Sequence, residues 1–260
     1  MSLVTSAVAA NSFPPTSWEE YARCYDSLCH LTPYMNMLRL VASHVHTGVQ
    51  ETLLDASCGT GNFERVLLES PMNHLMSIVG VDSSKEMLAR AQRKCAESAC
   101  VTFRETNLNC PLAFDHKSFS QVVSINTLYA VENPRFTLSE FFRVLKVGGQ
   151  LLLVTPKAGY ENGLILAEHC ESKHPNSFWG YVHGSPEREE CLIREAIKEE
   201  SIIEDMLTVA RHNRNIGANC NFHFFSPEDL LLLLADVGFS VTQNSRTYAD
   251  QALFIIATKP

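Results

Sequence analysis

The chain has 260 residues, of which 45% are hydrophobic and 19% charged, as expected of a soluble globular protein with one large domain or two small ones. Its net charge of −8 disfavours nucleic-acid binding, because phosphate contacts need a basic surface. Nine cysteines without a C-x-x-C pair indicate reduced structural thiols rather than a disulfide scaffold. The amino-terminal segment lacks the features of a signal peptide, and the most apolar run, residues 230–239, is too short to span a bilayer. A cytoplasmic protein is therefore expected.

Residues 1–47 are expected to form a loose arm followed by a helical cap. Residues 18–45 have a helical pattern, with Ser17 and Glu20 spaced as a capping box. Pro33 should divide this segment into two helices, because proline removes a backbone donor and clashes with the preceding turn.

Strands and helices then alternate through a core predicted at residues 48–156. Strands are predicted at 51–57, 76–82, 101–107, 118–126 and 150–156, and helices at 62–69, 83–98 and 133–149. Either Ser83 or Ser84 can cap the second helix, and a glycine pair is expected to end the third. Strands separated by helices indicate a parallel sheet with helices on both faces.

Residues 157–221 interrupt this alternation and are predicted to form an inserted helical lid, with an aromatic loop and a charged amphipathic run at 187–211. Residues 222–260 should complete the core with a helix at 225–239 and an antiparallel edge hairpin at 240–249 and 252–259. The fold class expected is α/β, a doubly wound, mostly parallel, Rossmann-like sheet of seven strands.

The stretch "LLDASCGTGNF", residues 53–63, lies at the carboxyl end of the first predicted strand, where such sheets bind ligands. It does not fit G-x-G-x-x-G, because Glu64 stands at the third glycine position and would repel a pyrophosphate that it faced. It does not fit the phosphate loop G-x-x-x-x-G-K-[ST] either, because no lysine follows. The loop therefore suits an adenosine ligand without phosphates.

A second acid, Asp82, ends the next strand, and an acid at that place accepts hydrogen bonds from a ribose diol. S-adenosylmethionine fits these features, because its cationic amino and sulfonium groups suit Asp55 and an acidic pocket. Its carboxylate can meet the helix that begins at Asn62. The alternative is that Asp55 and Asp82 only cap helices, but two acids around a Gly-x-Gly turn favour the ligand.

Several motifs together resemble the class I S-adenosylmethionine-dependent methyltransferases that act on small molecules. "LLDASCGTGNF" is similar to that family's first motif, and "VGVDSSKEMLARAQRK" to its ribose-binding strand and helix. "SFSQVVSINTLYAVENP" and "LSEFFRVLKVGGQLLLVTP" resemble its fourth and fifth strands with the helix between them. "FHFFSPEDLLLLLADVGF" resembles its late helix and Gly-Phe turn. The resemblance covers most of the chain.

The resemblance implies a set of residues that bind S-adenosylmethionine and its product, S-adenosylhomocysteine. These are Tyr25, Asp55, Ser57, Cys58, Gly59, Gly61, Asp82, Ser83, Met87, Asn107, Leu108 and Asn126. Tyr25 would close over the cofactor, and Asn107, which stands where the family often has aspartate, can still accept from the adenine amine. Ser57 replaces the usual first glycine. This replacement is harmless if the backbone φ is negative and unfavourable if it is positive.

Methyl transfer needs alignment and a dry site more than a catalytic triad, and the sequence shows no triad. Candidate bases are His30, Tyr129 and His183, although each histidine is as well explained as a surface or core residue and Tyr129 as a pocket wall. No metal site is expected, since His44 and His46 diverge on a helix. Residues 157–221, with the amino-terminal helices, are expected to choose the acceptor.

Three functions remain open at this point. The first is a methyltransferase acting on O, N or C of a small-molecule acceptor, with neither nucleic acid nor membrane as partner and with a homodimer left open. The second is a non-catalytic cofactor-binding or assembly protein that keeps the fold, which Ser57, Asn107 and the lack of an evident base favour. The third is an RNA or protein methyltransferase, which the acidic charge and the absence of an N-P-P-[YF] motif oppose.

Overall fold

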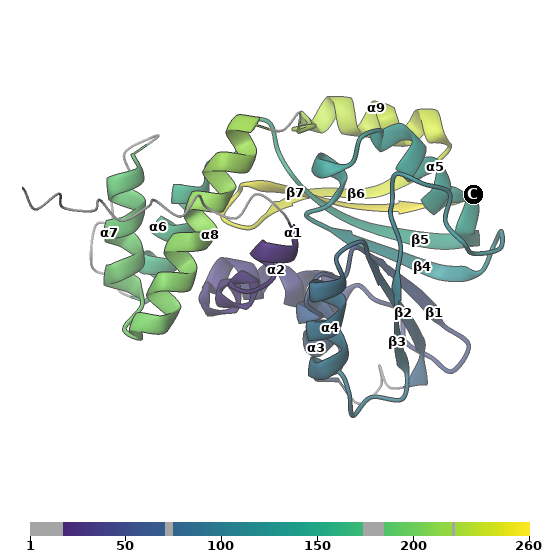
Figure 1. The fold of residues 1–260 in the computed structure, drawn as a ribbon. Helices are drawn as coiled ribbons and strands as arrows, with labels where there is room; N and C mark the ends of the chain where they lie inside the picture. Colours follow the sequence, from purple (N-terminus) through teal and green to yellow (C-terminus); the bar gives the residue numbers. More distant parts are fainter. Residues whose placement is uncertain (1–17, 71–74, 174–184, 220–221) are drawn as a thin grey trace, which may run out of the picture.

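The computed structural model describes residues 18–70, 75–173, 185–219 and 222–260, and its centre is one sheet of seven strands in the order β3-β2-β1-β4-β5-β7-β6 (Figure 1). The strands are β1 (Thr52–Ala56), β2 (Ser77–Asp82), β3 (Val101–Glu105), β4 (Phe119–Ile125), β5 (Leu145–Pro156), β6 (Ser240–Thr247) and β7 (Ala252–Thr258). β1 to β5 pair in parallel, whereas β7 runs antiparallel between β5 and β6. The predicted fold class, including the edge hairpin, is confirmed.

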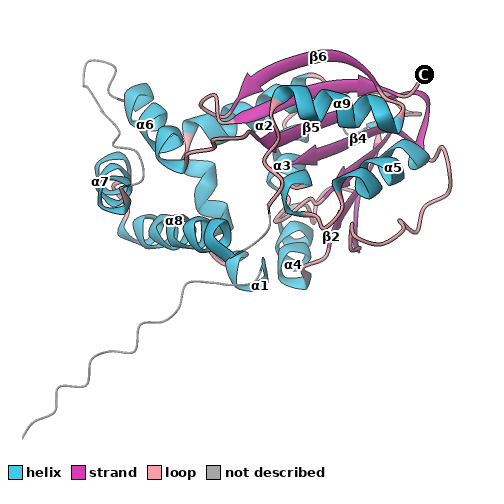
Figure 2. Cartoon of the chain, turned by 90° about the horizontal axis from the view of Figure 1, so that it is seen from above, coloured by secondary structure: helices cyan, strands magenta, loops and turns pink. Residues whose placement is uncertain are grey.

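Helices cover both faces of the sheet (Figures 1 and 2). On one face lie α2 (Thr32–Ser43), α3 (Asn62–Leu67) and α4 (Lys85–Lys94), and on the other α5 (Pro134–Val144) and α9 (Pro227–Val237). Side chains alternate between the two faces along each strand, so Leu53 and Val123 belong to the first core and Leu54 and Val122 to the second. Burial on both faces explains why the inner strands β5 and β7 are rich in apolar residues, whereas the edge strands β3 and β6 are polar and only partly buried.

Two helical groups extend the first face beyond the sheet. The amino-terminal group is α1 (Trp18–Tyr21), the 3-10 helix η1 (Tyr25–His30) and α2, and the second group is α6 (Asn162–Lys173), α7 (Pro186–Ala196) and α8 (Glu200–Asn219). α6 packs on α2, α7 on α6 and α8, and α8 on η1, so the two groups share one apolar core (Figure 1). Pro33 stands in the first turn of α2, which begins a new helix there as predicted.

Two predicted helices have different bounds in the structure. The helix expected at 133–149 ends at Val144, because β5 begins at Leu145 and pairs with β4, so the glycine pair lies inside the strand. The amphipathic run at 187–211 is divided between α7 and α8. Ser84, not Ser83, caps α4 by accepting from Met87 N, and Ser226 caps α9 by accepting from Asp229 N. Ser17 lies outside the described residues.

Within the described ranges, no helix combines the length and the apolar character needed to cross a bilayer.

Candidate cofactor and acceptor site

The loop after β1 turns back through three residues at positive φ: Ser57 at +83°, Gly59 at +55° and Gly61 at +79°. The amides of Ser57 and Cys58 both donate to the Val81 carbonyl at 2.8 Å, which fastens the turn to the end of β2. The extended conformation that would suit a serine at position 57 is therefore not the one adopted. A side chain at positive φ costs about 1 kcal/mol or more, so Ser57 stores strain in the loop.

Gly61 is required by close packing as well as by its φ. A Cβ atom built on Gly61 would lie 3.0 Å from the Ala91 Cα on α4, closer than packed atoms tolerate. The turn and α4 therefore pack backbone to backbone at Ala91. Gly61 supports the site from behind and does not line its cavity.

Asp55 and Glu64 also lie behind the loop, as a buried pair of carboxyl groups. Asp55 is 2% exposed and Glu64 fully buried, and the oxygens of Glu64 have no hydrogen-bond donor among the described residues. Burial raises the pKa of Glu64 to about 7, and burial together with the neighbouring Glu64 raises the pKa of Asp55. Two facing carboxyls are stable there only when they share a proton.

This pair corrects two expectations. Glu64 does not face the ligand, because its side chain points into the protein, where its Oε1 would lie 2.8 Å from a Cβ built on Gly80. Asp55 and Cys58 are buried and do not line the cavity, so any effect of these two residues on a cofactor passes through the loop.

Asp82, at the end of β2, connects the loop to α4. Its Oδ2 accepts from Gly59 N at 3.0 Å and from Ser57 Oγ at 3.3 Å, and its Oδ1 accepts from Ser84 N at 2.9 Å. Burial raises the pKa of Asp82, and these hydrogen bonds act in the opposite direction by stabilising the charged form. Oδ1 keeps a lone pair for one further donor on the cavity side.

A cavity of about 140 Å³ lies at the carboxyl ends of β1, β2 and β4. Of the residues predicted to bind the cofactor, the structure places these in its wall: Tyr25, Ser57, Gly59, Asp82, Ser83, Met87, Asn107, Leu108 and Asn126. The wall also contains residues that were not predicted: Trp18, Thr106, Asn109, Ile125, Thr127, Ala130 and Val131. Most of these residues are next to predicted positions at the strand ends, so their place in the sequence could have identified them. Trp18 is the exception, because it comes from α1 and is remote in sequence.

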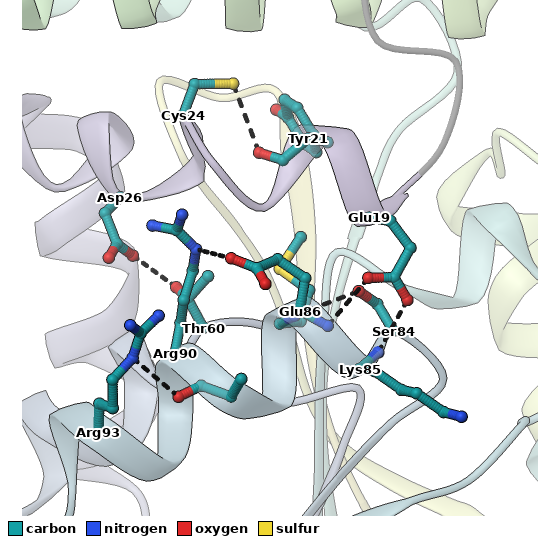
Figure 3. A network of polar contacts seen from close by, with 12 residues as sticks. Glu19, Tyr21, Cys24, Asp26, Thr60, Ser84, Lys85, Glu86, Arg90 and Arg93 are labelled. Carbon is teal, nitrogen blue, oxygen red and sulfur yellow. Dashed lines mark hydrogen bonds and ion pairs between the residues drawn. The ribbon is translucent and has the colours of Figure 1, made fainter.

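Polar contacts join α4 to the amino-terminal cap, which carries the cavity residues Trp18 and Tyr25; Figure 3 shows the contacts of Glu19. Both carboxylate oxygens of Glu19 accept from the first amides of α4, those of Lys85 at 2.8 Å and Glu86 at 2.9 Å. Glu19 thus caps a helix that is remote in sequence and fixes its neighbour Trp18.

A second contact fixes η1 next to Tyr25. Asp26 Oδ1 accepts from Lys94 Nζ at 2.8 Å and from Thr60 Oγ1 at 2.5 Å, and Lys94 also reaches Thr60 at 3.3 Å. We call Asp26, Lys94 and Thr60 the cap latch, because they join the cap, α4 and the cofactor loop. Figure 3 shows the contact between Asp26 and Thr60. The latch brings Tyr25 over the loop, where its Cε1 lies 3.7 Å from a Cβ position on Gly59.

A second cavity of about 430 Å³ adjoins the first and shares Trp18, Tyr25 and Asn126 with it. Its wall combines the cap, the strand ends and the α6–α8 group. The other lining residues are Tyr21, Leu28, Tyr129, Pro156, Tyr160, Glu161, Asn162, Ser185, Pro186, Glu189, Asn213, Arg214, Phe222, Phe224 and Tyr248. The three shared residues form a junction where two bound molecules would meet.

Asn126 occupies this junction in a strained conformation. It follows β4 at a φ of +51°, where its amide donates to the Val154 carbonyl at 2.8 Å. Its buried Oδ1 has no hydrogen-bond partner among the described residues. A strained residue with an unpaired acceptor at a junction of cavities is typical of a ligand contact.

The three candidate bases have different positions. Tyr129, in the 3-10 helix η3 (Leu128–Ala130), lines the second cavity, and its ring packs edge-on against Phe222 at 4.8 Å between centroids. His30 is exposed and lines neither cavity. His183 lies outside the described residues, as do Trp179 and Tyr181 of the predicted aromatic loop.

The fold and this site define the class I methyltransferase architecture. Residues 54–153 match the family described as "Methyltransferase domain". Over these residues the chain is similar to methyltransferase domains, and its sheet has the Rossmann-like fold of such enzymes.

Individual relatives agree with this assignment. The chain is 30% identical over 128 residues to a demethylmenaquinone methyltransferase of Tropheryma whipplei, covering 49% of this chain and 44% of that protein. It is 35% identical over 178 residues to the biotin biosynthesis bifunctional protein BioHC of Teredinibacter turnerae, covering 65% of this chain and 30% of that protein. The chain spans about half the length or less of these curated relatives.

Solved structures share the fold at low sequence identity. A geranyl diphosphate C-methyltransferase from Streptomyces coelicolor, in complex with geranyl diphosphate and S-adenosyl-L-homocysteine, superposes with a TM-score of 0.59 at 17% identity. The superposition covers 95% of this chain and 86% of that one.

Proposed function

We propose that this protein transfers a methyl group from S-adenosylmethionine to a small-molecule acceptor by in-line displacement. The observation that carries the proposal is the pair of cavities that meet at Trp18, Tyr25 and Asn126. One cavity lies where this fold binds nucleosides, and the other opens on it from the side of the helical groups. Such a junction places two reactants end to end.

The residues of the first cavity fit this cofactor. Asp82 keeps a lone pair for a ribose hydroxyl, and Asn107 offers a side-chain carbonyl where the adenine amine is expected. The unpaired Oδ1 of Asn126 suits the cationic end of the molecule. When bound, the cofactor supplies an electrophilic methyl group next to the junction.

The chain's own contribution would be alignment and the exclusion of water. Trp18 and Tyr25 cover the junction, and the Glu19 contacts and the cap latch hold both in place. Fixing two reactants in a dry site supplies much of the rate of a displacement. Tyr129 is the one candidate base among the described residues that faces the acceptor cavity.

The role of Tyr129 is open to a direct test. Its aromatic contacts with Phe222 and Phe224 favour a wall rather than a base. Tyr129→Phe keeps the ring and removes the hydroxyl. If Tyr129 only lines the cavity, kcat should fall less than about threefold and the pH profile should stay unchanged. A base predicts a fall of about 100-fold or more.

We further propose that residues 157–221, with the amino-terminal helices, act as a lid that selects the acceptor. α6, α7 and α8 contribute Asn162, Glu189 and Arg214 to the acceptor cavity and none of the described wall of the cofactor cavity. Exchange of this block for that of another methyltransferase should change acceptor preference and leave cofactor affinity intact. If the folded exchange variant lost cofactor binding, this block would not act on acceptor choice alone, and the proposal would be contradicted.

The function is tested by isothermal titration with S-adenosylmethionine and S-adenosylhomocysteine, followed by turnover of methyl-labelled cofactor against a panel of metabolites. We expect both cofactor forms to bind and label to move to at least one acceptor. A folded protein that binds neither form would overturn the proposal.

A second candidate function, a non-catalytic cofactor-binding or assembly protein, is favoured by one observation, the positive φ of Ser57. A protein that only binds the cofactor tolerates a strained loop more readily than an enzyme that must also align the cofactor for methyl transfer. Binding of the cofactor without transfer to any acceptor in the panel would support this second function over the first.

A further inference from the structure

The hairpin between β6 and β7 turns through three consecutive residues with a left-handed backbone. Tyr248, Ala249 and Asp250 have φ values of +57°, +56° and +60°, and Gln251 N donates to the Tyr248 carbonyl at 3.0 Å across the turn. Left-handed residues in hairpin turns are usually glycine, asparagine or aspartate, because the Cβ atom of other residues meets the following carbonyl. A tyrosine and an alanine in this conformation are strained, and only Asp250 suits it.

The turn changes the face of the sheet on which the Tyr248 side chain lies. Within β6, Arg246 pairs with Leu253 of β7, and Leu253 belongs to the core under α5 and α9. Since alternate residues of a strand face the same side, an extended chain would direct residue 248 to that core too. Tyr248 instead belongs to the core on the α2 side, where its ring packs edge-on against Tyr34 at 6.2 Å between centroids. The left-handed turn therefore places this ring in the wall of the second cavity.

Contacts around the turn hold it in the strained conformation. Gln251, which is 3% exposed, donates from Nε2 to the Ala249 carbonyl at 3.1 Å and accepts at Oε1 from Glu161 N at 2.9 Å. Asp250 Oδ2 accepts from Lys157 Nζ at 3.2 Å. Lys157 and Glu161 lie between β5 and α6, so the turn is fastened to the chain that leads into the α6–α8 group. Strain that the surroundings enforce in this way is typical of functional positions.

We propose that Tyr248 is a specificity-determining residue whose ring limits the length of the methyl acceptor, and that the left-handed turn holds this ring in place. The inference rests on the proposed methyltransferase function and adds a residue that belongs to neither helical group. Tyr248 lines the second cavity and is not in the described wall of the cofactor cavity. Burial raises the pKa of Tyr248, so its hydroxyl stays protonated and the residue acts through the size of its ring.

The first test compares two neutral, fluorescent probes of different length, 2-naphthol and 2-anthracenol. Both are titrated by fluorescence into the full chain saturated with S-adenosylhomocysteine, and both should bind because aromatic rings form much of the cavity wall. Tyr248→Ala removes the ring and lengthens the cavity, so the affinity for 2-anthracenol should rise about tenfold relative to that for 2-naphthol. Tyr248→Phe keeps the ring and should restore the wild-type ratio of affinities.

Three results would overturn the assignment of Tyr248. They are an unchanged ratio in Tyr248→Ala, a ratio in Tyr248→Phe that follows the alanine variant, and failure of both probes to bind the wild-type protein. If Tyr248→Ala does not fold, Tyr248→Leu keeps an apolar side chain and should shift the ratio in the same direction by about threefold. An unchanged ratio in a folded Tyr248→Leu variant counts equally against the proposal.

Ala249→Gly tests the turn without altering the ring. Glycine adopts the left-handed conformation without strain, so the midpoint of thermal unfolding should rise by about 1–3 °C. The more flexible turn should hold Tyr248 less firmly and shift the probe ratio about threefold toward 2-anthracenol. Lys117→Gly is the matched control, because Lys117 has a φ of +59° and is exposed in the loop before β4. It should gain stability with the wild-type ratio.

The turn has no positioning role if Ala249→Gly is stabilised and keeps the wild-type ratio, and it is not strained if this variant is less stable than wild type. S-adenosylhomocysteine binding separates the two levels of proposal. Its absence in the wild-type protein defeats the methyltransferase function itself. Its presence with an unchanged probe ratio in Tyr248→Ala defeats only the role of Tyr248.

Discussion

The two cavities are built in different ways although they meet at three residues. The cofactor cavity is formed by strand ends and by a loop whose backbone amides and glycines determine its shape, with Asp82 accepting three hydrogen bonds there. The second cavity is formed by side chains from the cap, α6–α8 and the segment before α9, together with residues at or just beyond strand ends, Tyr129, Pro156 and Tyr248. Under the proposed function, the sheet would position the cofactor, and the helices packed beyond the sheet would contribute most to acceptor choice. Changes behind or beside the loop should consequently affect cofactor binding and stability, with little effect on acceptor choice.

The largest effect is expected from Asp82→Ala. The substitution removes the acceptor of Gly59 N, Ser57 Oγ and Ser84 N together with the proposed ribose contact. Charge-assisted hydrogen bonds contribute about 1.5–3 kcal/mol each, so the dissociation constant for S-adenosylhomocysteine should rise about 1,000-fold by isothermal titration.

The control for this change is Asp236→Ala, which removes an exposed acid paired with Arg135 far from the loop. Its cofactor affinity should equal that of the wild-type protein. Asp82→Asn keeps the shape and the acceptor oxygen and should fall between the two. A thermal melt of each variant shows whether the loss reflects binding or unfolding.

The next effect concerns stability behind the loop, where Glu64→Gln replaces the buried acid by its isostere. Burial raises the pKa of Glu64 to about 7, so between about pH 4.5 and 7 the folded chain keeps a proton that the unfolded chain has released. The free energy of unfolding of the wild-type protein should therefore fall as pH rises through this window. The variant lacks the Glu64 proton and should show a smaller fall, because the raised pKa of Asp55 still contributes, and the difference should be about 3 kcal/mol by pH 8.

Urea unfolding at pH 5 and pH 8 measures this difference. Glu69→Gln is the matched control, because Glu69 is exposed just beyond the same helix and should show the pH dependence of the wild-type protein. Parallel pH dependence of wild type and Glu64→Gln would show that Glu64 itself holds no extra proton in the folded protein.

A smaller effect is expected from the cap latch. Lys94→Met removes the donor to Asp26 and Thr60 and frees η1, so Tyr25 should cover the cofactor less firmly. We expect S-adenosylhomocysteine affinity to fall about tenfold, mainly through faster dissociation in stopped-flow measurements. Lys85→Met, an exposed lysine at the other end of α4, serves as control. Equal dissociation rates in both variants would show that the cap stays in place without the latch.

The sequence signals on the cofactor side are local. The strand-turn-helix pattern identified the loop and Asp82, and most of the predicted cofactor residues line one cavity. It did not reveal that Glu64 turns inward, since the direction of a side chain at the start of a short helix depends on the space left by Gly80. The bounds of α5 were wrong for a related reason, because strand pairing with β4 overrides helix propensity after Val144.

The acceptor side was largely beyond prediction. Trp18, Tyr160, Phe224 and Tyr248 are far apart in the chain, and only the packing of α6–α8 against η1 and α2 brings them to one wall. The same is true of the contacts of Glu19 with α4 and of the ion pair between Glu189 and Arg214. No local pattern marks a contact between helices that are remote in sequence.

The smallest effect is expected at Ser57. The sequence left open whether serine is tolerated here in place of glycine, and the structure gives it a φ of +83°. Ser57→Gly relieves a side chain at a φ of +83° but loses the 3.3 Å hydrogen bond to Asp82 and gains flexibility in the unfolded chain. We expect a net stabilisation of about 0.5–1 kcal/mol in urea unfolding, with cofactor affinity unchanged or slightly improved. Ser57→Ala separates the contributions, because it removes the hydroxyl and keeps the strained Cβ, and it should be less stable than wild type. If glycine destabilises the protein as much as alanine does, the hydrogen bond to Asp82 outweighs the strain and serine is the better residue for this loop. That result would remove the one structural observation that favours a non-catalytic role.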